Sequence, residues 1–514
     1  MAAEYLSLFK VFMKENIDIS NVLNSGFITQ GKQVEMFESK LKEYFSYPRI
    51  LTVNSGTSGL TLALRLLNLN IGDEVISTPL TCTATNWPIL ANGLKIKWAD
   101  VDLETCNISL QSIREKLSEK TKAIMVVHWG GYPVDLDELS KIQDEAYEKY
   151  GFRPYIIEDC AHAFGAKYKG KYIGTRENIC VFSLQAIKHL TCGDGGLIFL
   201  PTNELYERAK LLRWFGIDRE KRSNGNDLRL ESDIQEWGYK YHMNDINASI
   251  GLQNLPYIQD NLNKLNDIAN LYRKRISKFK PEIKLLKEHK DFESARWIFT
   301  IKVVNKPQFI DFMKEKNIMV SQVHNRNDIH SCVSESKTFL PNLDILEKEM
   351  ICIPAGWWLS PNDTERILTS LEEWYKINKL TFRRLNKNDY EKGYMELISR
   401  KCESKKAFED ILTHIDYQLG ELIVGEINGE LVCSGRIQVD IKFESPVVRI
   451  EDIVVKKEYR KNQIGTRLIN YLTKQAEFYS PYKIILTCSE ELIHMYQKCN
   501  YQVSGAYMKY VKQD

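Results

Sequence analysis

A lysine in a loop rich in serine and glycine is the residue of this chain best suited to covalent chemistry. Lys188 lies in the segment 182–196, which begins near Ser183 and ends in a glycine-rich turn before an apolar run. A lysine amine held among polar backbone groups can bond to the aldehyde of a cofactor and then move protons. Because lysine is common on protein surfaces, an exposed and unreactive side chain is the alternative.

Two further segments carry groups that suit a phosphate and a heteroaromatic ring. Gly56 and Thr57 follow Ser55 at an expected helix start, where backbone N–H groups favour a phosphate. Asp159 follows the apolar run 155–157, and α/β sheets bind ligands at the carboxyl ends of their strands. An aspartate there can pair with a protonated pyridine nitrogen. The alternative for both segments is simple helix capping.

A third group of residues, nearer the C-terminus, suits an acyl carrier that contains a pyrophosphate. Glu451 and Asp452 lie in an expected strand at 447–455. A basic loop with Arg460 and Lys461 then precedes an expected helix. Backbone amides at a helix start can hold a pyrophosphate. The alternative is a basic loop that only caps the helix in solvent.

The hydrophobic pattern predicts the elements that position these groups. Leu60, Leu64 and Leu67 share one face of a helix that starts at Gly56. Short apolar runs recur at 74–76, 96–98, 123–127, 155–157, 181–182 and 197–200. Strands that alternate with helices imply a mostly parallel sheet covered on both faces, so the fold class is α/β.

Two changes of pattern divide the rest of the chain. From about Asn254 the sequence predicts a smaller region with a charged helix at 261–278 and a strand at 297–304. Near 377 the pattern restarts as a separate α+β region. Its expected elements are a strand at 382–385, a helix from 388, a hairpin at 421–440, a strand at 447–455 and a helix at 465–479. The turn Asn428-Gly429 between apolar runs is a strong hairpin signal.

Composition and charge exclude several classes of protein. Lys+Arg 70 against Asp+Glu 68 leaves a net charge of +2 over 514 residues, which argues against binding to nucleic acid or a membrane surface. Eleven cysteines without a Cys-x-x-Cys pair argue against a disulfide framework and a zinc ribbon, and no metal is expected. Without an apolar run of ~18 residues or a leader-like start, a cytoplasmic protein is expected.

Residues 20–375 resemble the sugar-nucleotide aminotransferases of the DegT/DnrJ/EryC1/StrS family. The matching stretches are NSGTSGLTLAL, GDEVISTPLTCTATN, IIEDCAHAFGAKYKGKYIG, FSLQAIKHLTCGDGG, GYKYHMNDINASIGLQNL and ICIPAGWWL. The resemblance implies a type I fold that depends on pyridoxal 5′-phosphate. We expect a large cofactor-binding domain at 1–253 and a small α+β domain at 254–376.

The resemblance also assigns roles to individual residues. Lys188 falls at the lysine that bonds to the cofactor, and Asp159 at the partner of the pyridinium nitrogen. His162 falls where relatives have Gln or His near the ring hydroxyl. The phosphate positions are Gly56, Thr57 and Ser183.

Two positions bear on the surroundings of this site. Asn244 falls at the residue that reaches the phosphate from the neighbouring subunit, so a homodimer is implied. Cys82 stands where relatives often have an aromatic residue that stacks on the cofactor ring. Trp87 is a nearby aromatic residue, but its expected role is packing.

Residues 380–514 resemble the GNAT N-acetyltransferases, which use acetyl-CoA, and a GNAT domain is expected at 377–514. Within them, RRLNKNDYEKGYMELIS, IEDIVVKKEYRKNQIGTRL and ILTCSEELIHMYQKCNY resemble glucosamine-6-phosphate N-acetyltransferase. The Arg-x-x-Gly-x-Gly/Ala loop of the superfamily falls at Arg460, Lys461, Gln463, Ile464, Gly465 and Thr466. Gln463 and Thr466 depart from that loop, although Gln463 also occurs in the named branch.

The resemblance places the acyl-transfer chemistry on three residues. Tyr496 falls at the tyrosine that faces the departing thiol, although a tyrosine on a terminal helix is also a common core residue. Glu451 and Asp452 fall near the amino-sugar acceptor. Leu492 and Asn500 stand where Asn and Gly are usual, so the choice of acceptor is open.

Together the two resemblances imply a bifunctional enzyme of amino-sugar nucleotide synthesis. Lys188 would transfer an amino group from glutamate to a nucleotide-linked keto-deoxysugar, and the fused domain would acetylate the new amine. Two alternatives remain open: the acetyltransferase acts on a hexosamine phosphate, or one half only binds its ligand. Lys188 and Tyr496 argue against the second alternative, since a binding module needs neither.

Overall fold

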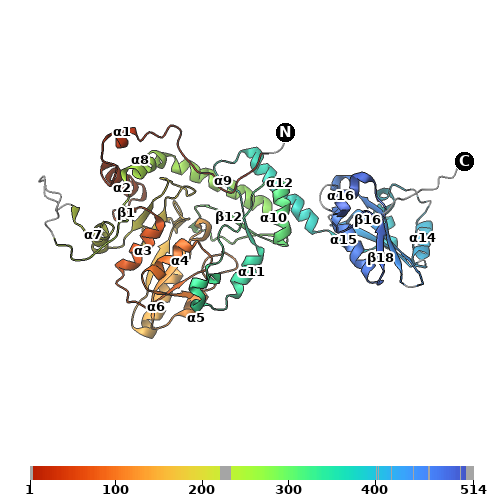
Figure 1. Ribbon diagram of the computed structural model, residues 1–514, viewed down its shortest axis with the longest axis horizontal. Helices are drawn as coiled ribbons and strands as arrows, with labels where there is room; N and C mark the ends of the chain where they lie inside the picture. Colours follow the sequence, from red (N-terminus) through yellow and green to blue (C-terminus); the bar gives the residue numbers. More distant parts are fainter. Residues whose placement is uncertain are drawn as a thin grey trace. The chain divides into compact units, whose positions relative to one another are not determined.

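The chain forms two compact units, Met1–Ser370 and Leu371–Asp514, which we call unit 1 and unit 2 (Figure 1). The computed structural model describes residues 4–219, 233–400, 402, 404–417, 419–443, 445–460, 464–497 and 499–504. The domain boundaries expected from the sequence stay predictions. Among the described residues, none of the helices combines the length and the apolar character that crossing a membrane requires.

Unit 1 is built on a seven-stranded mixed sheet in the order β1-β9-β8-β5-β4-β2-β3. Its strands are β1 (Ile50–Val53), β2 (Glu74–Ser77), β3 (Lys95–Trp98), β4 (Thr121–Val127), β5 (Tyr155–Asp159), β8 (Ile179–Ser183) and β9 (Gly196–Phe199). Neighbours from β3 to β8 pair in parallel, whereas β9 runs antiparallel to both β8 and β1. The predicted mostly parallel sheet is confirmed, and β1 is a strand that the pattern did not predict.

Both faces of this sheet are buried, as continuous apolar strands require. Along β4, Ile124 belongs to one hydrophobic cluster with Phe37, while Met125 belongs to another with Leu60. The α-helices of unit 1 are α1 (Ser20–Asn24), α2 (Lys32–Phe45), α3 (Gly56–Leu66), α4 (Thr83–Ala91), α5 (Leu110–Lys116), α6 (Leu136–Tyr150), α7 (Asn203–Leu212), α8 (Asp245–Asn254), α9 (Ile258–Ile276), α10 (Lys306–Glu315) and α11 (Pro341–Glu349).

Short elements complete unit 1. Two small sheets have the orders β10-β12-β13 and β11-β6-β7. Their strands are β6 (Lys167–Tyr168), β7 (Lys171–Tyr172), β10 (Ile283–Leu285), β11 (Phe292–Glu293), β12 (Phe299–Val303) and β13 (Met350–Ile353). Single 3-10 turns are η1 (Trp129–Gly131), η3 (Leu255–Tyr257), η4 (Asn327–Ile329) and η5 (Ser331–Ser336), and α12 (Pro361–Asn378) runs on into unit 2.

Unit 2 contains a five-stranded sheet in the order β14-β15-β16-β17-β18. Its elements are β14 (Thr381–Arg384), η6 (Lys387–Tyr390), α13 (Tyr394–Leu397), α14 (Lys405–Tyr417), β15 (Gly420–Ile427), β16 (Glu430–Asp440), β17 (Val447–Val455), η7 (Lys457–Tyr459), α15 (Ile464–Glu477), β18 (Lys483–Leu486), η8 (Glu490–Leu492) and α16 (Ile493–Gln497). The hairpin turn at Asn428-Gly429 is confirmed, with positive φ at both residues. The helix expected from 388 is only a 3-10 turn, because Gly393 takes φ +81° before α13 begins.

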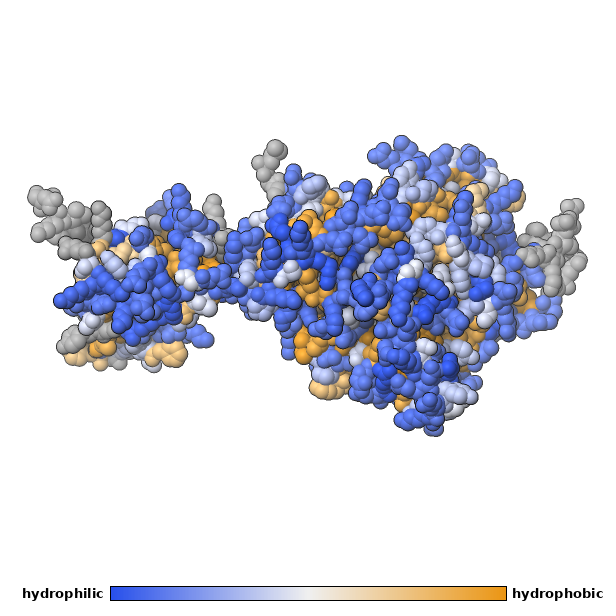
Figure 2. Space-filling model, turned by 180° about the vertical axis from the view of Figure 1, so that it is seen from behind, coloured by the Kyte–Doolittle hydropathy of each residue, from blue (hydrophilic) through white to orange (hydrophobic). Residues whose placement is uncertain are grey.

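The core of unit 2 lies between α15 and its sheet. Ile464, Leu468 and Leu472 repeat at four-residue intervals, so they form one buried stripe that packs on Val432 and Val448. On the face shown in Figure 2, hydrophilic residues cover most of the protein surface and hydrophobic ones form small patches.

Candidate active sites

Lys188 lies in the loop between β8 and β9, half-buried against the face of an aromatic ring. Its Nζ is 3.5 Å from the ring centroid of Trp297. Burial lowers the pKa of the amine to about 7, although the nearby charge of Asp159 opposes the shift. An amine with this pKa is half neutral at neutral pH, and the neutral form is the one that attacks an aldehyde.

Asp159 ends β5 and is almost fully buried. Its Oδ2 accepts a hydrogen bond from the Thr85 hydroxyl (2.6 Å), and its Oδ1 accepts one from the Ala161 N–H (3.0 Å). Burial raises the pKa of the carboxyl group, whereas these hydrogen bonds and the charge of Lys188 oppose the rise. A cation bound against Asp159 also opposes this rise in pKa, and the protonated ring nitrogen of a cofactor is such a cation.

Trp297 is held by contacts with neighbouring rings and by a hydrogen bond from its indole nitrogen. His162 stacks on it, with ring centroids 3.8 Å apart and planes 17° apart. Phe9 also stacks on this ring, with centroids 5.1 Å apart and planes 28° apart. The indole Nε1–H donates to the carbonyl oxygen of Ile187 at 3.0 Å, which ties the ring to the residue before Lys188.

Three histidine rings near Lys188 have a buried nitrogen that has no hydrogen-bond partner among the described residues. These atoms are Nδ1 of His162, Nδ1 of His189 and Nε2 of His324. Burial and the charge of Lys188 lower all three pKa values, for His189 and His324 to about 4, so the rings are neutral. Because buried polar atoms are normally hydrogen-bonded, these unpaired nitrogens fit a polar group bound beside Lys188.

The predicted phosphate residues lie next to one another. A Cβ added to Gly56 would stand 3.3 Å from Cβ of Ser183, so the start of α3 touches the end of β8. Ser55 caps α3 by accepting the Ser58 N–H at 3.1 Å. The amides of Gly56 and Thr57 occupy first-turn positions that lack an intrahelical acceptor. Gly56, Thr57 and Ser183, together with the Asp159–Lys188 pair, therefore fit pyridoxal phosphate.

Asn244 is placed differently from the other predicted cofactor residues. It caps α8, and its Oδ1 accepts the Asn247 N–H at 2.8 Å. In the described part of the chain no hydrogen bond joins Asn244 to Gly56, Thr57 or Ser183. The predicted role of Asn244 across a subunit interface stays a prediction.

A buried His–Glu–Cys cluster lies just behind Asp159. Val134 N–H donates to Nδ1 of His128 at 3.0 Å, so the proton is on Nε2, which donates to Glu158 at 2.9 Å. The other oxygen of Glu158 accepts from Asn178 at 2.6 Å. His128, Glu158 and Cys160 have the spacing of a metal site, but these hydrogen bonds already occupy the ring and the carboxylate. We interpret them as a support for β5.

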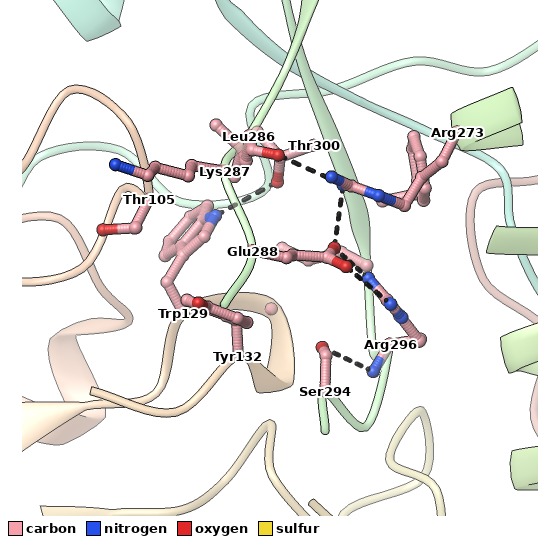
Figure 3. Close-up of a pocket in the computed structure, with 13 residues that line it drawn as sticks. Thr105, Trp129, Tyr132, Arg273, Leu286, Lys287, Glu288, Ser294, Arg296 and Thr300 are labelled. Atoms are coloured by element: carbon pink, nitrogen blue, oxygen red, sulfur yellow. Dashed lines mark hydrogen bonds and ion pairs between the residues drawn. The ribbon is translucent and has the colours of Figure 1, made fainter. Parts of the chain in front are cut away.

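A small cavity of about 30 Å³ lies beside Trp129, whose ring is in edge contact with His162 (Figure 3). Glu288 lies between two arginines there, accepting from Arg273 at 2.8 Å and from Arg296 at 2.9 Å. Arg296 takes a left-handed φ of +60°, directly before Trp297. The volume suits about two waters, so we assign the cavity no substrate. The ion pairs instead hold the segment that presents Trp297.

In unit 2 the strands β17 and β18 separate at one end. Their parallel pairing runs from Val447–Lys483 to Ile450–Leu486 and stops there, although β17 continues to Val455. Asp452 takes a positive φ of +51° just past that point, where the pairing with β16 also shifts register. The opening leaves backbone N–H and C=O groups on one edge of β17 for an extended ligand.

Tyr496 lies beside this opening. It belongs to α16, is 6% exposed and packs in a cluster that Ile453 of β17 and Leu486 of β18 also contact. Burial raises the pKa of its hydroxyl group, and neighbouring thiols add to the rise. The hydroxyl therefore stays protonated at neutral pH and can donate to an anion.

The other residues predicted in unit 2 are spread around the same opening. Glu451 and Asp452 are exposed on β17, at the point where it leaves β18. Arg460 donates to the carbonyl oxygen of Val455 at 3.0 Å. Ile464, Gly465 and Thr466 form the first turn of α15, where amides lack an intrahelical acceptor. Lys461 and Gln463 lie outside the described residues.

Comparison with known proteins assigns both units to families. The profile of the DegT/DnrJ/EryC1/StrS aminotransferase family matches residues 12–372. The chain belongs to this family. A profile of the GNAT acetyltransferase family matches residues 373–501. We therefore call unit 1 the aminotransferase unit and unit 2 the acetyltransferase unit.

Similar proteins cover the aminotransferase unit. The structure of AtS13 from Actinomadura melliaura is 46% identical with a TM-score of 0.69, and covers 72% of this chain and 99% of its own. The sugar aminotransferase CalS13 from Micromonospora echinospora is 40% identical with a TM-score of 0.69, over 71% and 99%. GDP-perosamine synthase from Escherichia coli O157:H7 is 34% identical over 56% of this chain and 74% of its own.

Sequence reasoning missed several residues of the aminotransferase site. Thr85 lies in a quoted motif, but its bond to Asp159 depends on how α4 packs against β5. Trp297 was expected only as the first residue of a strand, and it is 109 positions from Lys188. His324 follows Val323, which takes a left-handed φ of +71° that no sequence signal indicates.

Proposed function

We propose that the chain is a bifunctional enzyme that aminates a nucleotide-linked keto-deoxysugar and then acetylates the new amine. The best candidate substrate is a 4-keto-6-deoxyhexose linked to UDP or dTDP, with glutamate as the amino donor and acetyl-CoA as the acyl donor. The similarity to proteins named as a sugar aminotransferase and as GDP-perosamine synthase supports a sugar substrate.

In the aminotransferase unit, the proposed roles come from the family resemblance, and contacts within the chain support them. Pyridoxal phosphate supplies an aldehyde and an electron-withdrawing ring when it is bound. Lys188 is the group that bonds to it and carries protons, because its lowered pKa leaves the amine partly neutral. Asp159 would pair with the ring nitrogen, and His162, which stacks on Trp297, would lie near the ring hydroxyl. Gly56, Thr57 and Ser183 bind the phosphate.

We also propose that the aminotransferase unit is a homodimer. Asn244 caps α8 through its Oδ1 alone, so its Nδ2 can still donate a hydrogen bond to a neighbouring subunit's phosphate. The adjacent Asp245 accepts the N–H groups of Gly31 and Val34 at the start of α2 and so holds this segment in place.

In the acetyltransferase unit, the amine nitrogen attacks the thioester carbonyl. The C–N bond forms as the C–S bond breaks, and the leaving thiolate gains a proton from Tyr496. The proton lost by the nitrogen, passed on through water, restores the Tyr496 hydroxyl, so the proton balance closes. Acetyl-CoA lies along the open edge of β17, with its pyrophosphate at the first turn of α15. Glu451 and Asp452 face the amine.

A single observation carries the proposal: one chain holds a lysine tuned for amine transfer and a unit whose reaction consumes an amine. Burial leaves the Lys188 amine with a pKa of about 7, and the acetyltransferase profile begins directly after the aminotransferase profile. A keto-sugar has no nitrogen to acetylate, so amination must come first.

The proposal is tested with the full chain, pyridoxal phosphate and a panel of 4-keto-6-deoxy and 3-keto sugar nucleotides. Glutamate labelled with ¹⁵N is the amino donor, and mass spectrometry follows the sugar nucleotide before and after acetyl-CoA is added. We expect ¹⁵N in the product first and an acetyl group on the same molecule afterwards. Label transfer without acetylation of that product would contradict the second activity.

A further inference from the structure

The first described segment of the chain, residues 5–14, crosses the aminotransferase unit before α1 and contains none of the predicted site residues. We call it the N-terminal strap. At one end, Leu6 pairs with Ile318 in an isolated parallel bridge. The Leu6 N–H donates to the carbonyl oxygen of Asn317 at 2.9 Å, and the Met319 N–H donates to that of Leu6 at 2.9 Å. The strap is therefore tied to the segment that follows α10.

The other end of the strap is held beside the loop that carries Lys188. The Lys14 N–H donates to Oδ1 of Asn254 at 3.0 Å, and Nδ2 of Asn254 donates to the carbonyl oxygen of Thr191 at 2.9 Å. Thr191 follows Lys188 in the same loop. Asn254 is almost fully buried, so its two hydrogen bonds fix the strap against this loop.

Two phenylalanine rings of the strap contact tryptophans between these ends. Phe9 stacks on Trp297 with ring centroids 5.1 Å apart and planes 28° apart. Phe12 meets Trp357 edge-on, with centroids 5.2 Å apart. Both phenylalanines are half-buried. Of the two, Phe9 is the one that contacts the ring beside the Lys188 amine.

Phe9 limits the access of water to Trp297 and, through it, to the Lys188 amine. Trp297 is only 6% exposed, and Nζ of Lys188 lies 3.5 Å from its ring centroid. Burial is the main cause that lowers the pKa of Lys188 to about 7. Without the Phe9 ring, the indole would stay bound to Ile187 through its N–H, but water would reach its uncovered surface. The amine would then lie in a wetter environment.

The charges that act on the Lys188 amine lie outside the strap. Among the described residues, the titratable groups near this amine are Asp159 at the end of β5, Cys82 before α4, and the histidines His162, His189 and His324. Asp159 and Cys82 favour the charged amine, and the three histidines are neutral. A change at Phe9 therefore alters the burial of the amine and removes no charge.

We propose that Phe9 is a positioning residue of the aminotransferase site, whose ring covers Trp297 and so keeps water from the Lys188 amine. Phe9 acts through Trp297 and is not itself a catalytic residue. This inference rests on the proposed role of Lys188, and it adds the N-terminal strap to the segments that build the site.

The test measures how the reactivity of single lysines depends on pH in the full, cofactor-free chain. A trace of acetic anhydride acetylates neutral amines, and peptide mass spectrometry gives a midpoint for each lysine. Phe9→Ala removes the stacking ring, and Phe9→Tyr keeps one. Phe12→Ala is the matched control, because it makes the same truncation at the strap ring that contacts Trp357. Lys306, whose pKa burial also lowers, reports whether the unit is folded.

We expect a Lys188 midpoint near 7 in the unsubstituted protein, in Phe9→Tyr and in Phe12→Ala. In Phe9→Ala it should rise by about one pH unit, because partial hydration reverses part of the shift that burial causes. Lys306 should keep its midpoint in every variant.

Three results would overturn the positioning role while the proposed role of Lys188 stands. They are an unchanged Lys188 midpoint in Phe9→Ala, an equal rise in Phe12→Ala, and a joint rise of Lys188 and Lys306 in Phe9→Ala. The last result would mean that the strap supports the whole fold. A Lys188 midpoint of about 10 in the unsubstituted protein, as in an ordinary lysine, would overturn both.

Discussion

The two sites of this chain treat their reactive groups in opposite ways. In the aminotransferase unit, Asp159 is almost fully buried and Lys188 is half-buried, and burial moves both pKa values towards neutrality. In the acetyltransferase unit, Glu451 and Asp452 are exposed on a strand whose edge is open. A nucleophile that belongs to the protein must be tuned by its surroundings. A nucleophile that arrives with the substrate needs only a place beside the acyl group.

The largest effect is expected when Lys188, the proposed nucleophile with a lowered pKa, is replaced. Lys188→Ala should reduce amine transfer by on the order of a thousandfold or more, as removal of a covalent catalytic group does. Lys171→Ala, at an exposed lysine, is the matched control. Mass spectrometry of the sugar nucleotide measures amination, and CoA release from a supplied amine measures acetylation. Normal amination by Lys188→Ala would show that the site is elsewhere.

Tyr496→Phe tests whether Tyr496 donates a proton to the leaving group in the acetyltransferase unit. Loss of one donor to a developing anion costs on the order of a hundredfold in rate, so CoA release should slow by that amount. Amination should be unaffected, because the residue lies in the other unit. Tyr482→Phe, at a 64% exposed tyrosine, is the control. Equal CoA release by the two variants would mean that Tyr496 is only a core residue.

How much of both sites the sequence predicts depends on how local the interactions are. The strand end at Asp159 and the helix start at Gly56 follow from short patterns, and the structure places both at the expected element ends. The contact between Lys188 and the Trp297 ring depends on segments far apart in the chain. No periodicity encodes such contacts. The sequence analysis also missed β1, which has only four residues, and it missed α14 although Phe408, Ile411, Leu412 and Ile415 repeat with helical spacing.

Burial of neutral histidines predicts a loss of stability in acid. The pKa of His189 is about 4 in the folded protein, against 6.5 in the unfolded chain, so the unfolded chain binds more protons between these values. Lowering the pH from 7 to 5 should therefore cost about 2 kcal/mol of unfolding free energy through this residue. His189→Gln should flatten the pH dependence by that amount.

Tryptophan fluorescence in urea measures this effect in the aminotransferase unit. Of the nine tryptophans, only Trp374 lies beyond Ser370. His289→Gln changes an exposed ring and is the control. An unchanged pH dependence in His189→Gln would contradict the assignment of a neutral, buried His189. Among the described residues of the acetyltransferase unit no histidine is buried, so this effect of acid should act on the aminotransferase unit.

The smallest expected effect concerns the Trp297 ring. A cation over an aromatic face gains about 1 kcal/mol, so Trp297→Leu should weaken the protonated form of Lys188 roughly fivefold. Trp297→Phe keeps a ring and should behave like the unsubstituted protein. The pH at which the cofactor-free protein regains visible absorbance with pyridoxal phosphate should lie near 7, and lower in Trp297→Leu. An identical midpoint in both variants would contradict the role of the ring.

The early end of the β17–β18 pairing also affects how the protein behaves in storage and at high concentration. Unpaired backbone groups on an apolar strand are a template for pairing with another chain. The open segment contains Ile453, Val454 and Val455 and carries no proline to block such pairing. A ligand that lies along this edge covers it. Acetyl-CoA should therefore act as a solubilising agent, and preparations depleted of it should aggregate first through the acetyltransferase unit.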